Sequence, residues 1–205
     1  MVQSFLSQDW YRVAPLRPRL RSHVDIHRQR FRGQTWFVVQ DSHSGRYHRL
    51  SPAANLMLSL IAEVLERDVD GIDLCYIRGP MYVGYEATAI EDFKHAHGVD
   101  PREIDEKDER WIRHKADYVT QFARDVRTLV DDVSTRRGKK LEVAAQPYWT
   151  EALNLHHGLD VRTWLTEGLV DTLQMGPRDE AMLALIKAHN CELVANVGAR
   201  TPENY

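Results

Sequence analysis

The feature of the sequence that most constrains the fold is the stretch VDGIDLCYIRGP at residues 69–80. Read with the two-residue period of a β-strand, it has one apolar face and one face that carries polar groups. The first face consists of Ile72, Leu74 and Tyr76, and the second consists of Asp73, Cys75 and Ile77. Polar groups on the second face favour a strand of a parallel barrel, in which one face meets helices and the other faces the lumen. An edge strand with one solvated face is the alternative for this stretch.

Beyond this strand, strands and helices alternate along the chain. Strands are predicted at 141–148, 169–175 and 191–197, and helices at 87–97, 111–133, 161–167 and 179–189. Such alternation indicates parallel β/α units, because a helix must carry the chain back before the next parallel strand can start. We therefore predict an α/β fold, namely a partial (β/α)8 barrel of the TIM type with about four β/α units. An open four-stranded parallel sheet is the alternative.

The first 50 residues differ from the rest of the chain in charge. They hold nine arginines, no lysine and three aspartates, whereas the whole chain has a net charge of -3. The arginines form either a solvated basic arm or a site for an acidic partner such as nucleic acid. Nucleic-acid binding is disfavoured by the negative total charge and by the absence of a helix-turn-helix or base-stacking motif.

The same region is predicted to hold a small hairpin and a helix. Residues 1–33, which contain Pro15 and Pro18, are expected to be irregular or extended. A β-hairpin is predicted at 34–50, with strands at 34–40 and 46–50 around a turn that contains glycine. A helix is expected to begin at Ser51-Pro52, with the serine as the N-cap.

Segments of this N-terminal region also carry a family resemblance. They lie at residues 9–13, 16–21, 32–36 and 45–54. Together they resemble the PqqD-like segment that opens a group of bacterial peptide zinc metalloproteases. The resemblance covers residues 5–58 and implies a partial winged-helix unit that binds a peptide by adding it to a strand edge. The His-Glu-x-x-His motif of the metalloproteases is absent from the chain.

A second, more specific resemblance covers residues 57–205. It is carried by residues 70–80, 84–86, 98–101, 110–111, 116–118, 141–143, 158–161 and 167–171. These segments resemble a family-ten-like glycosyl hydrolase, a bacterial group of hydrolase-like barrels. The resemblance implies a TIM barrel, a carbohydrate substrate and glycosidase activity. Many members carry an aspartate where this chain has Cys75.

These resemblances predict the domain organisation and the function. Residues 1–56 would form a basic PqqD-like segment and residues 57–205 a partial barrel that corresponds to about the second half of the parent fold. The chain would then be a fragment or a fusion. The function implied is that of a carbohydrate-active hydrolase. The chain is then either an active enzyme or a truncated and inactive one. The alternative is a PqqD-like peptide-binding module with an inert barrel fragment attached.

Glycoside hydrolysis requires two carboxyl groups that flank the scissile bond. The predicted catalytic residues are Asp73, in the lumen-facing register, and Glu86, in the connection that follows the same strand. The alternative for Asp73 is a structural role in the lumen, in which it pairs with a neighbouring strand. Glu86 has the alternative of a surface charge.

The remaining candidates lie where barrel strands end, which is where barrel active sites are built. The predicted substrate-binding residues are Arg78, Tyr85, Gln146, Tyr148, Trp149 and Gln174. Arginine can form forked hydrogen bonds with a substrate or a carboxylate, and an aromatic ring can stack on a sugar face. The alternatives are an ion pair for Arg78 and a capping role for the aromatic residues.

Other chemistries find little support in the sequence. Cys75 and Cys191 are far apart and belong to no C-x-x-C motif, so neither a disulfide framework nor a zinc site is predicted. His156 and His157 follow in a predicted loop with Asn154, but adjacent histidines do not suit a single ion. No metal or other cofactor is therefore expected. Neither a signal peptide nor a membrane span is apparent, and a cytoplasmic location is expected.

Overall fold

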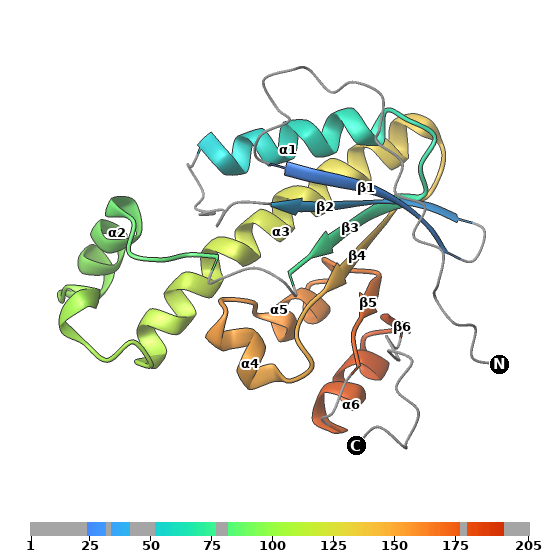
Figure 1. Cartoon of the computed structure of the whole chain (residues 1–205). Coiled ribbons are helices and arrows are strands. Elements are labelled where there is room, and N and C mark those ends of the chain that lie inside the picture. Colours follow the sequence, from blue (N-terminus) through green and yellow to red (C-terminus); the bar gives the residue numbers. More distant parts are fainter. Residues whose placement is uncertain (1–23, 32–33, 42–51, 77–81, 177–179, 195–205) are drawn as a thin grey trace.

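The computed structural model describes residues 24–31, 34–41, 52–76, 82–176 and 180–194 (Figure 1). In chain order these residues form a hairpin and a helix, and then strands that alternate with helices up to the last strand. The elements are β1 Val24–Phe31, β2 Gln34–Asp41, α1 Pro52–Leu65, β3 Gly71–Cys75, α2 Ala87–His97, a 3-10 turn at Pro101–Glu103, α3 Glu109–Arg137, β4 Glu142–Gln146, α4 Glu151–His156, α5 Val161–Thr166, β5 Thr172–Gln174, α6 Glu180–Ala188 and β6 Glu192–Val194.

These strands form a single sheet in their chain order, β1-β2-β3-β4-β5-β6. The first pair is antiparallel, and each later pair is parallel. The strands predicted from the alternating pattern, β3 to β6, are thereby confirmed as parallel neighbours. β4 and β5 are shorter than predicted, because the apolar runs continue beyond the hydrogen-bonded residues into the flanking loops.

The partner of β2 differs from the prediction. β2 pairs with β1 on one edge, with Val24 opposite Asp41, and with β3 on its other edge, with Val38 opposite Asp73. A strand has only two edges, so the predicted pairing of residues 34–40 with residues 46–50 is wrong. Residues 46–50 themselves lie outside the described part of the chain. Before residue 34, β1 adopts the extended alternative of the prediction, but its pairing with β2 was not predicted.

The helices form one continuous layer against the sheet. α1 contacts α3, α3 contacts α5, and α5 contacts α6, so helices that follow one another along the sheet also pack together. The strand residues Ile72, Val143 and Leu173 are buried in a core that they share with these helices. A doubly wound sheet would carry helices on both faces. The sequential strand order and the one-sided helix layer are therefore consistent with a partial TIM-like fold.

The longest helix, α3, follows directly from its sequence. Its buried positions recur every three or four residues between Trp111 and Val133. The Asp108 carboxylate caps its start by accepting from the Arg110 N–H at 2.9 Å, and Gly138 ends it with a φ of 60°. The predicted helix is confirmed, with longer bounds. Among the described residues, no helix is both long and apolar enough to cross a bilayer.

One described helix was not predicted. The sequence reading leaves Asn154 and His156 in a loop, but both belong to α4. The hydroxyl of Thr150 accepts from the Leu153 N–H at 3.2 Å and caps the start of this helix. A helix of six residues is too short to show an apolar period in the sequence.

Ion pairs tie the amino ends of the strands to the helix layer. Arg127 of α3 lies 2.7 Å from the Asp171 carboxylate just before β5. The same Asp171 oxygen accepts from the Val143 N–H in β4 at 2.9 Å. Lys139 lies 2.8 Å from Asp70, just before β3. Because this end serves stability in barrels, the functional site is expected at the carboxyl ends of the strands.

Candidate functional site

The candidate site lies on the sheet face that points away from the helices, toward the carboxyl ends of β3, β4 and β5. Strand pairing places Asp73 opposite Ala144, and Ala144 opposite Thr172. Gln146 and Gln174 lie one pleat further along β4 and β5, on the same face. The small side chain of Ala144 leaves room for both glutamines to reach back to Asp73. The strand pairing therefore places Asp73 on the sheet face that was predicted to face the lumen.

Asp73 is the centre of this group. Its Oδ2 atom accepts a hydrogen bond from the Nε2 atom of Gln146 and another, at 3.2 Å, from the Nε2 atom of Gln174. Its Oδ1 atom is buried and has no hydrogen-bond partner. Asp73 thus pairs with side chains of β4 and β5, in line with its structural alternative, while its Oδ1 atom has no partner among the described residues.

The environment of Asp73 favours its neutral form. The residue has no exposed surface, and burial raises its pKa from 3.8 to about 7. The hydrogen bond from Gln146 acts in the opposite direction, because it stabilises the carboxylate. The dominant cause is loss of hydration rather than repulsion from a second carboxylate. Such a group can exchange a proton near neutral pH.

The loop after β4 forms the rim of the site. The Tyr148 ring stacks on the His157 ring, with centroids 4.3 Å apart and an interplanar angle of 22°. Trp149 is 48% exposed and is one of the few large apolar side chains open to solvent among the described residues. We call Tyr148, Trp149 and His157 the aromatic rim. The first two were predicted, whereas the stacking role of His157 was not.

Asn154 holds the aromatic rim in place and was not predicted to do so. It has no exposed surface. Its Oδ1 accepts from the Tyr148 N–H at 2.7 Å, and its Nδ2 donates to the Tyr148 carbonyl at 3.0 Å. One side chain therefore satisfies both backbone groups of a rim residue. An asparagine that follows a strand end by several residues carries no sequence signal for such a contact.

The Asn154→Ala variant is expected to be less stable than the wild type by about 2–4 kcal/mol, because both Tyr148 backbone groups lose their buried partner. Urea unfolding followed by circular dichroism measures this loss. Hydrogen exchange of the rim amides should rise more than that of the α3 amides. The Asn154→Asp variant keeps the acceptor and should lose less. Equal stability of wild type and Asn154→Ala would contradict the anchoring role.

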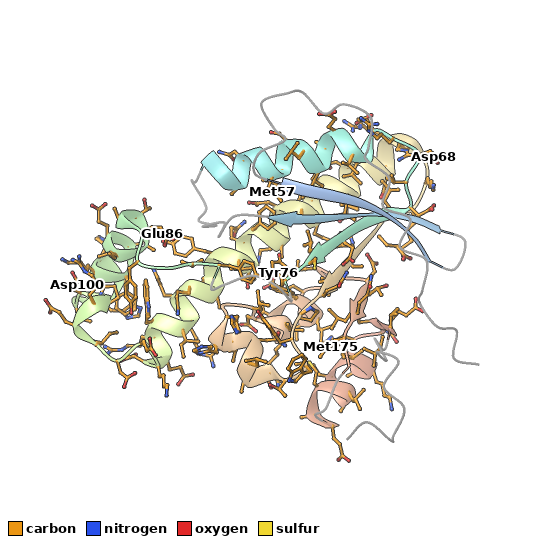
Figure 2. All side chains as sticks on the ribbon, viewed as in Figure 1. Met57, Asp68, Tyr76, Glu86, Asp100 and Met175 are labelled. Carbon is orange, nitrogen blue, oxygen red and sulfur yellow. The ribbon has the colours of Figure 1, made fainter. Side chains whose placement is uncertain are left out.

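Glu86 is not part of this group. Figure 2 shows it at the start of α2, away from Tyr76 at the end of β3. Both oxygens of its carboxylate lie near the Gly84 backbone nitrogen, at 3.2 and 2.9 Å. The structure therefore brings together Asp73, Gln146 and Gln174, but it does not add Glu86 to them.

The other predicted binding residues divide between the two loops. Tyr85 is 47% exposed, and its ring stacks on the Trp111 ring of α3 at a centroid distance of 5.2 Å. It lies in the connection after β3, whereas Trp149 lies in the loop after β4. Arg78 lies outside the described residues.

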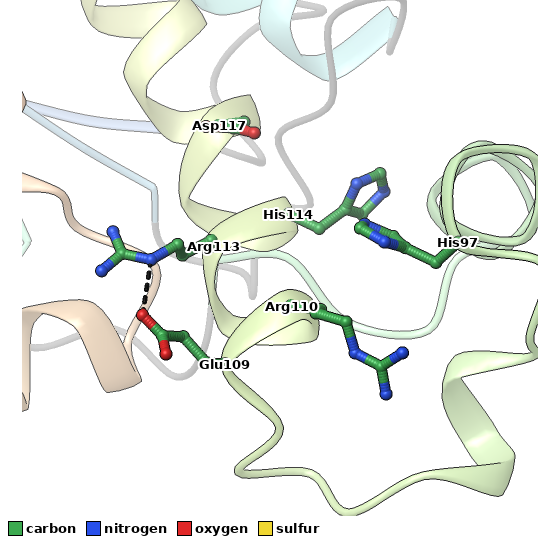
Figure 3. A pocket seen from close by; sticks show the side chains of 6 residues that line it. All are labelled: His97, Glu109, Arg110, Arg113, His114 and Asp117. Carbon is green, nitrogen blue, oxygen red and sulfur yellow. Dashed lines mark hydrogen bonds and ion pairs between the residues drawn. The ribbon is translucent and has the colours of Figure 1, made fainter.

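An open pocket of about 340 Å³ lies between α2 and α3, on the part of the structure that projects from the sheet (Figures 1 and 3). It is lined by His97, Glu109, Arg110, Arg113, His114 and Asp117. Its arginines are engaged already, since Arg113 pairs with Glu109 at 2.8 Å and Arg110 pairs with Asp108 at 2.6 Å. These pairs satisfy the charges of both arginines and of Glu109. Within the described ranges, no cluster of histidine, cysteine and carboxylate side chains suits a metal ion.

Comparison with known families identifies this architecture. Residues 3–176 match the sequence model of the family described as glycosyl hydrolase-like 10. The chain belongs to the glycosyl hydrolase-like 10 family. The match includes the strands that carry Asp73, Gln146 and Gln174. It also runs through residues 5–58, and so gives no support to a separate PqqD-like segment or to a peptide partner.

A comparison with solved structures finds a partial similarity to a longer chain. One similar structure is an N-acetylglucosaminidase of glycoside hydrolase family 18 from Paenibacillus barengoltzii, with 17% sequence identity and a TM-score of 0.36. The similarity covers 60% of this member of the glycosyl hydrolase-like 10 family and 28% of the Paenibacillus chain. No curated protein matches the sequence.

Proposed function

We propose that this glycosyl hydrolase-like 10 chain acts on carbohydrate through the sheet face around Asp73. The observation that supports the proposal is a fully buried carboxyl group with one unpartnered oxygen, held by two glutamines at the carboxyl ends of the strands. This is the end of a barrel sheet where active sites form. The family match supports carbohydrate as the substrate class, and the buried carboxyl group supports Asp73 as the proposed proton donor.

Asp73 is proposed as the general acid. Cleavage of a glycosidic bond requires a proton on the leaving oxygen, and an acid with a raised pKa can hold that proton near neutral pH. Oδ2 accepts from both glutamines, so the proton of neutral Asp73 belongs on the unpartnered Oδ1. Because Asp73 has no exposed surface, the side chains that cover it must move when a substrate oxygen reaches it.

The second carboxyl group is assigned to Glu86 as a hypothesis. Its support is its place in the connection after β3, the strand that carries Asp73. In this structure its carboxylate faces the Gly84 N–H, so this connection would have to rearrange when substrate binds.

A second candidate function is carbohydrate binding without hydrolysis. Hydrolysis needs two carboxyl groups, whereas the hydrogen-bonded group at the strand ends contains only one among the described residues, that of Asp73. Product release separates the two candidates. Both predict binding to a glycan, but only the first predicts new reducing ends.

The proposal is tested with a panel of soluble polysaccharides, by affinity electrophoresis and by assay of reducing ends. Trp149→Ala is expected to weaken binding about tenfold, on the order of 1.4 kcal/mol, because an exposed ring that stacks on sugar is lost. Trp149→Phe keeps a ring and should retain most of the affinity. Absence of binding to every polysaccharide, or equal binding by wild type and Trp149→Ala, would contradict the proposed site.

A further inference from the structure

Lys115 is a cation on the buried side of α3. Its side chain is only 2% exposed. Its Nζ atom lies 5.7 Å from the centre of the Trp111 ring and has no hydrogen-bond or ion-pair partner within the described part of the chain. An ammonium group that is buried there loses its hydration, and the attraction to the ring face compensates only part of that free-energy cost. Burial accordingly lowers the pKa of Lys115, and only the carboxylate of Glu106 acts against this effect.

His157 lies beside Lys115 and has an unpartnered atom of its own. Its Nδ1 atom is buried and forms no hydrogen bond. Burial lowers the pKa of His157, and the nearby charges of His156 and Lys115 lower it further. Two buried polar groups that both disfavour additional positive charge thus lie close enough to act on each other electrostatically, and neither forms an ion pair with a carboxylate among the described residues.

The backbone fixes this pair at the base of the aromatic rim. The chain turns at Gly158, with a φ of 80°, and a Cβ atom there would lie 3.7 Å from the Lys115 carbonyl group. This close approach packs the end of α4 against α3. His157 is stacked on Tyr148, two residues after Gln146. The residue after His157 therefore lies against the Lys115 backbone, and His157 itself belongs to the aromatic rim.

The geometry points to a subsite in which Lys115 and His157 bind the anionic group of an acidic sugar, with Tyr148 and Trp149 beside the sugar ring. This assignment rests on the proposed function, because it names the substrate class of that site. An anion would give the Lys115 ammonium a charged acceptor and the His157 ring a partner for its buried nitrogen. A neutral sugar would leave the ammonium without a charged hydrogen-bond acceptor. Glu106 and His156 are the other titratable groups that act on the pair electrostatically.

The assignment is tested by titrating the full chain with D-glucuronate and with D-glucose while the histidine ring signals are followed by NMR. The His157 signals are assigned with the His157→Gln variant. Glucuronate is expected to shift them saturably and to raise the pKa of His157 by about one unit, because an opposite charge favours the protonated ring. Glucose should shift them little. Sodium chloride at equal ionic strength controls for screening.

The Lys115→Met variant is expected to bind glucuronate about tenfold more weakly, because a charge-assisted hydrogen bond is lost. It keeps the apolar stem against Trp111 and removes a buried charge, so its melting temperature should not fall. The matched control Lys94→Met removes an exposed charge on α2 and should bind as the wild type does.

Equal affinity of wild type and Lys115→Met for glucuronate, or an equal response to glucose, would overturn the assignment. Binding of inorganic sulfate without binding of glucuronate would also overturn it, since the site would then be a simple anion site. The proposed function fails differently. In that case glucuronate binds through Lys115, whereas no polysaccharide binds in a manner that depends on Trp149.

Discussion

Replacing Asp73 by asparagine is expected to reduce glycoside turnover by about 10²- to 10⁴-fold, which is the range that a positioned general acid contributes. Asparagine has nearly the same shape and can still accept a hydrogen bond from Gln146 or Gln174, but it has no acidic proton to transfer. Glycan binding through the aromatic rim should persist, because Trp149 lies on the exposed rim and not at the buried carboxyl. Turnover and affinity therefore separate in this variant.

The pH profile distinguishes loss of the acid from a general disturbance of the site. The pKa of Asp73 is about 7, so wild-type turnover should fall as the pH rises above that value, because the ionised form cannot donate a proton. The residual activity of Asp73→Asn should lack this decline. Glu86→Gln serves as the comparison, since it alters the other proposed carboxyl and leaves Asp73 in place. Full turnover in Asp73→Asn would rule out the acid role and favour binding without hydrolysis.

The position of Asp73 was predictable because strand alternation is a local property. A period of two decides which face a residue occupies, and the β/α alternation decides which face meets helices. Gln146 and Gln174 were predictable for the same reason, since each ends a strand of the same sheet. Their convergence on one carboxylate oxygen was not predictable, because it depends on the register between strands.

Three features that the sequence did not predict have different physical causes. β1 has alternation at its start, where Val24 and Ile26 flank Asp25, but the arginines that follow obscure the pattern. Lys115 also left a signal that could have been read. It lies four residues after Trp111 and four before Val119, on the stripe that α3 buries, where a charged side chain is unusual. Asn154 left no such signal, because its role arises only when the loop after β4 folds back on α4.

The pH dependence of stability should also identify Asp73. Below pH 3.8 the group is protonated in both the folded and the unfolded chain, so it adds no pH dependence. Between pH 3.8 and about 7 the folded chain holds a proton that the unfolded chain has released, so rising pH destabilises the fold. The total loss is about 4 kcal/mol, because each unit of pKa difference corresponds to about 1.36 kcal/mol. Urea unfolding at pH 4 to 8 measures it.

Asp73→Asn should remove this slope, because the buried amide never ionises. Relative to the wild type, the variant should therefore gain up to about 4 kcal/mol between pH 4 and pH 8. Comparison of the two proteins at each pH cancels the contributions of His114 and His157, whose lowered pKa values act in the opposite direction. Asp68→Asn is the control, because the side chain of Asp68 is 99% exposed and should follow the wild-type curve. If wild type and Asp73→Asn show parallel curves, Asp73 is ionised in the folded chain at pH 4, and it cannot be the acid of a glycosidase.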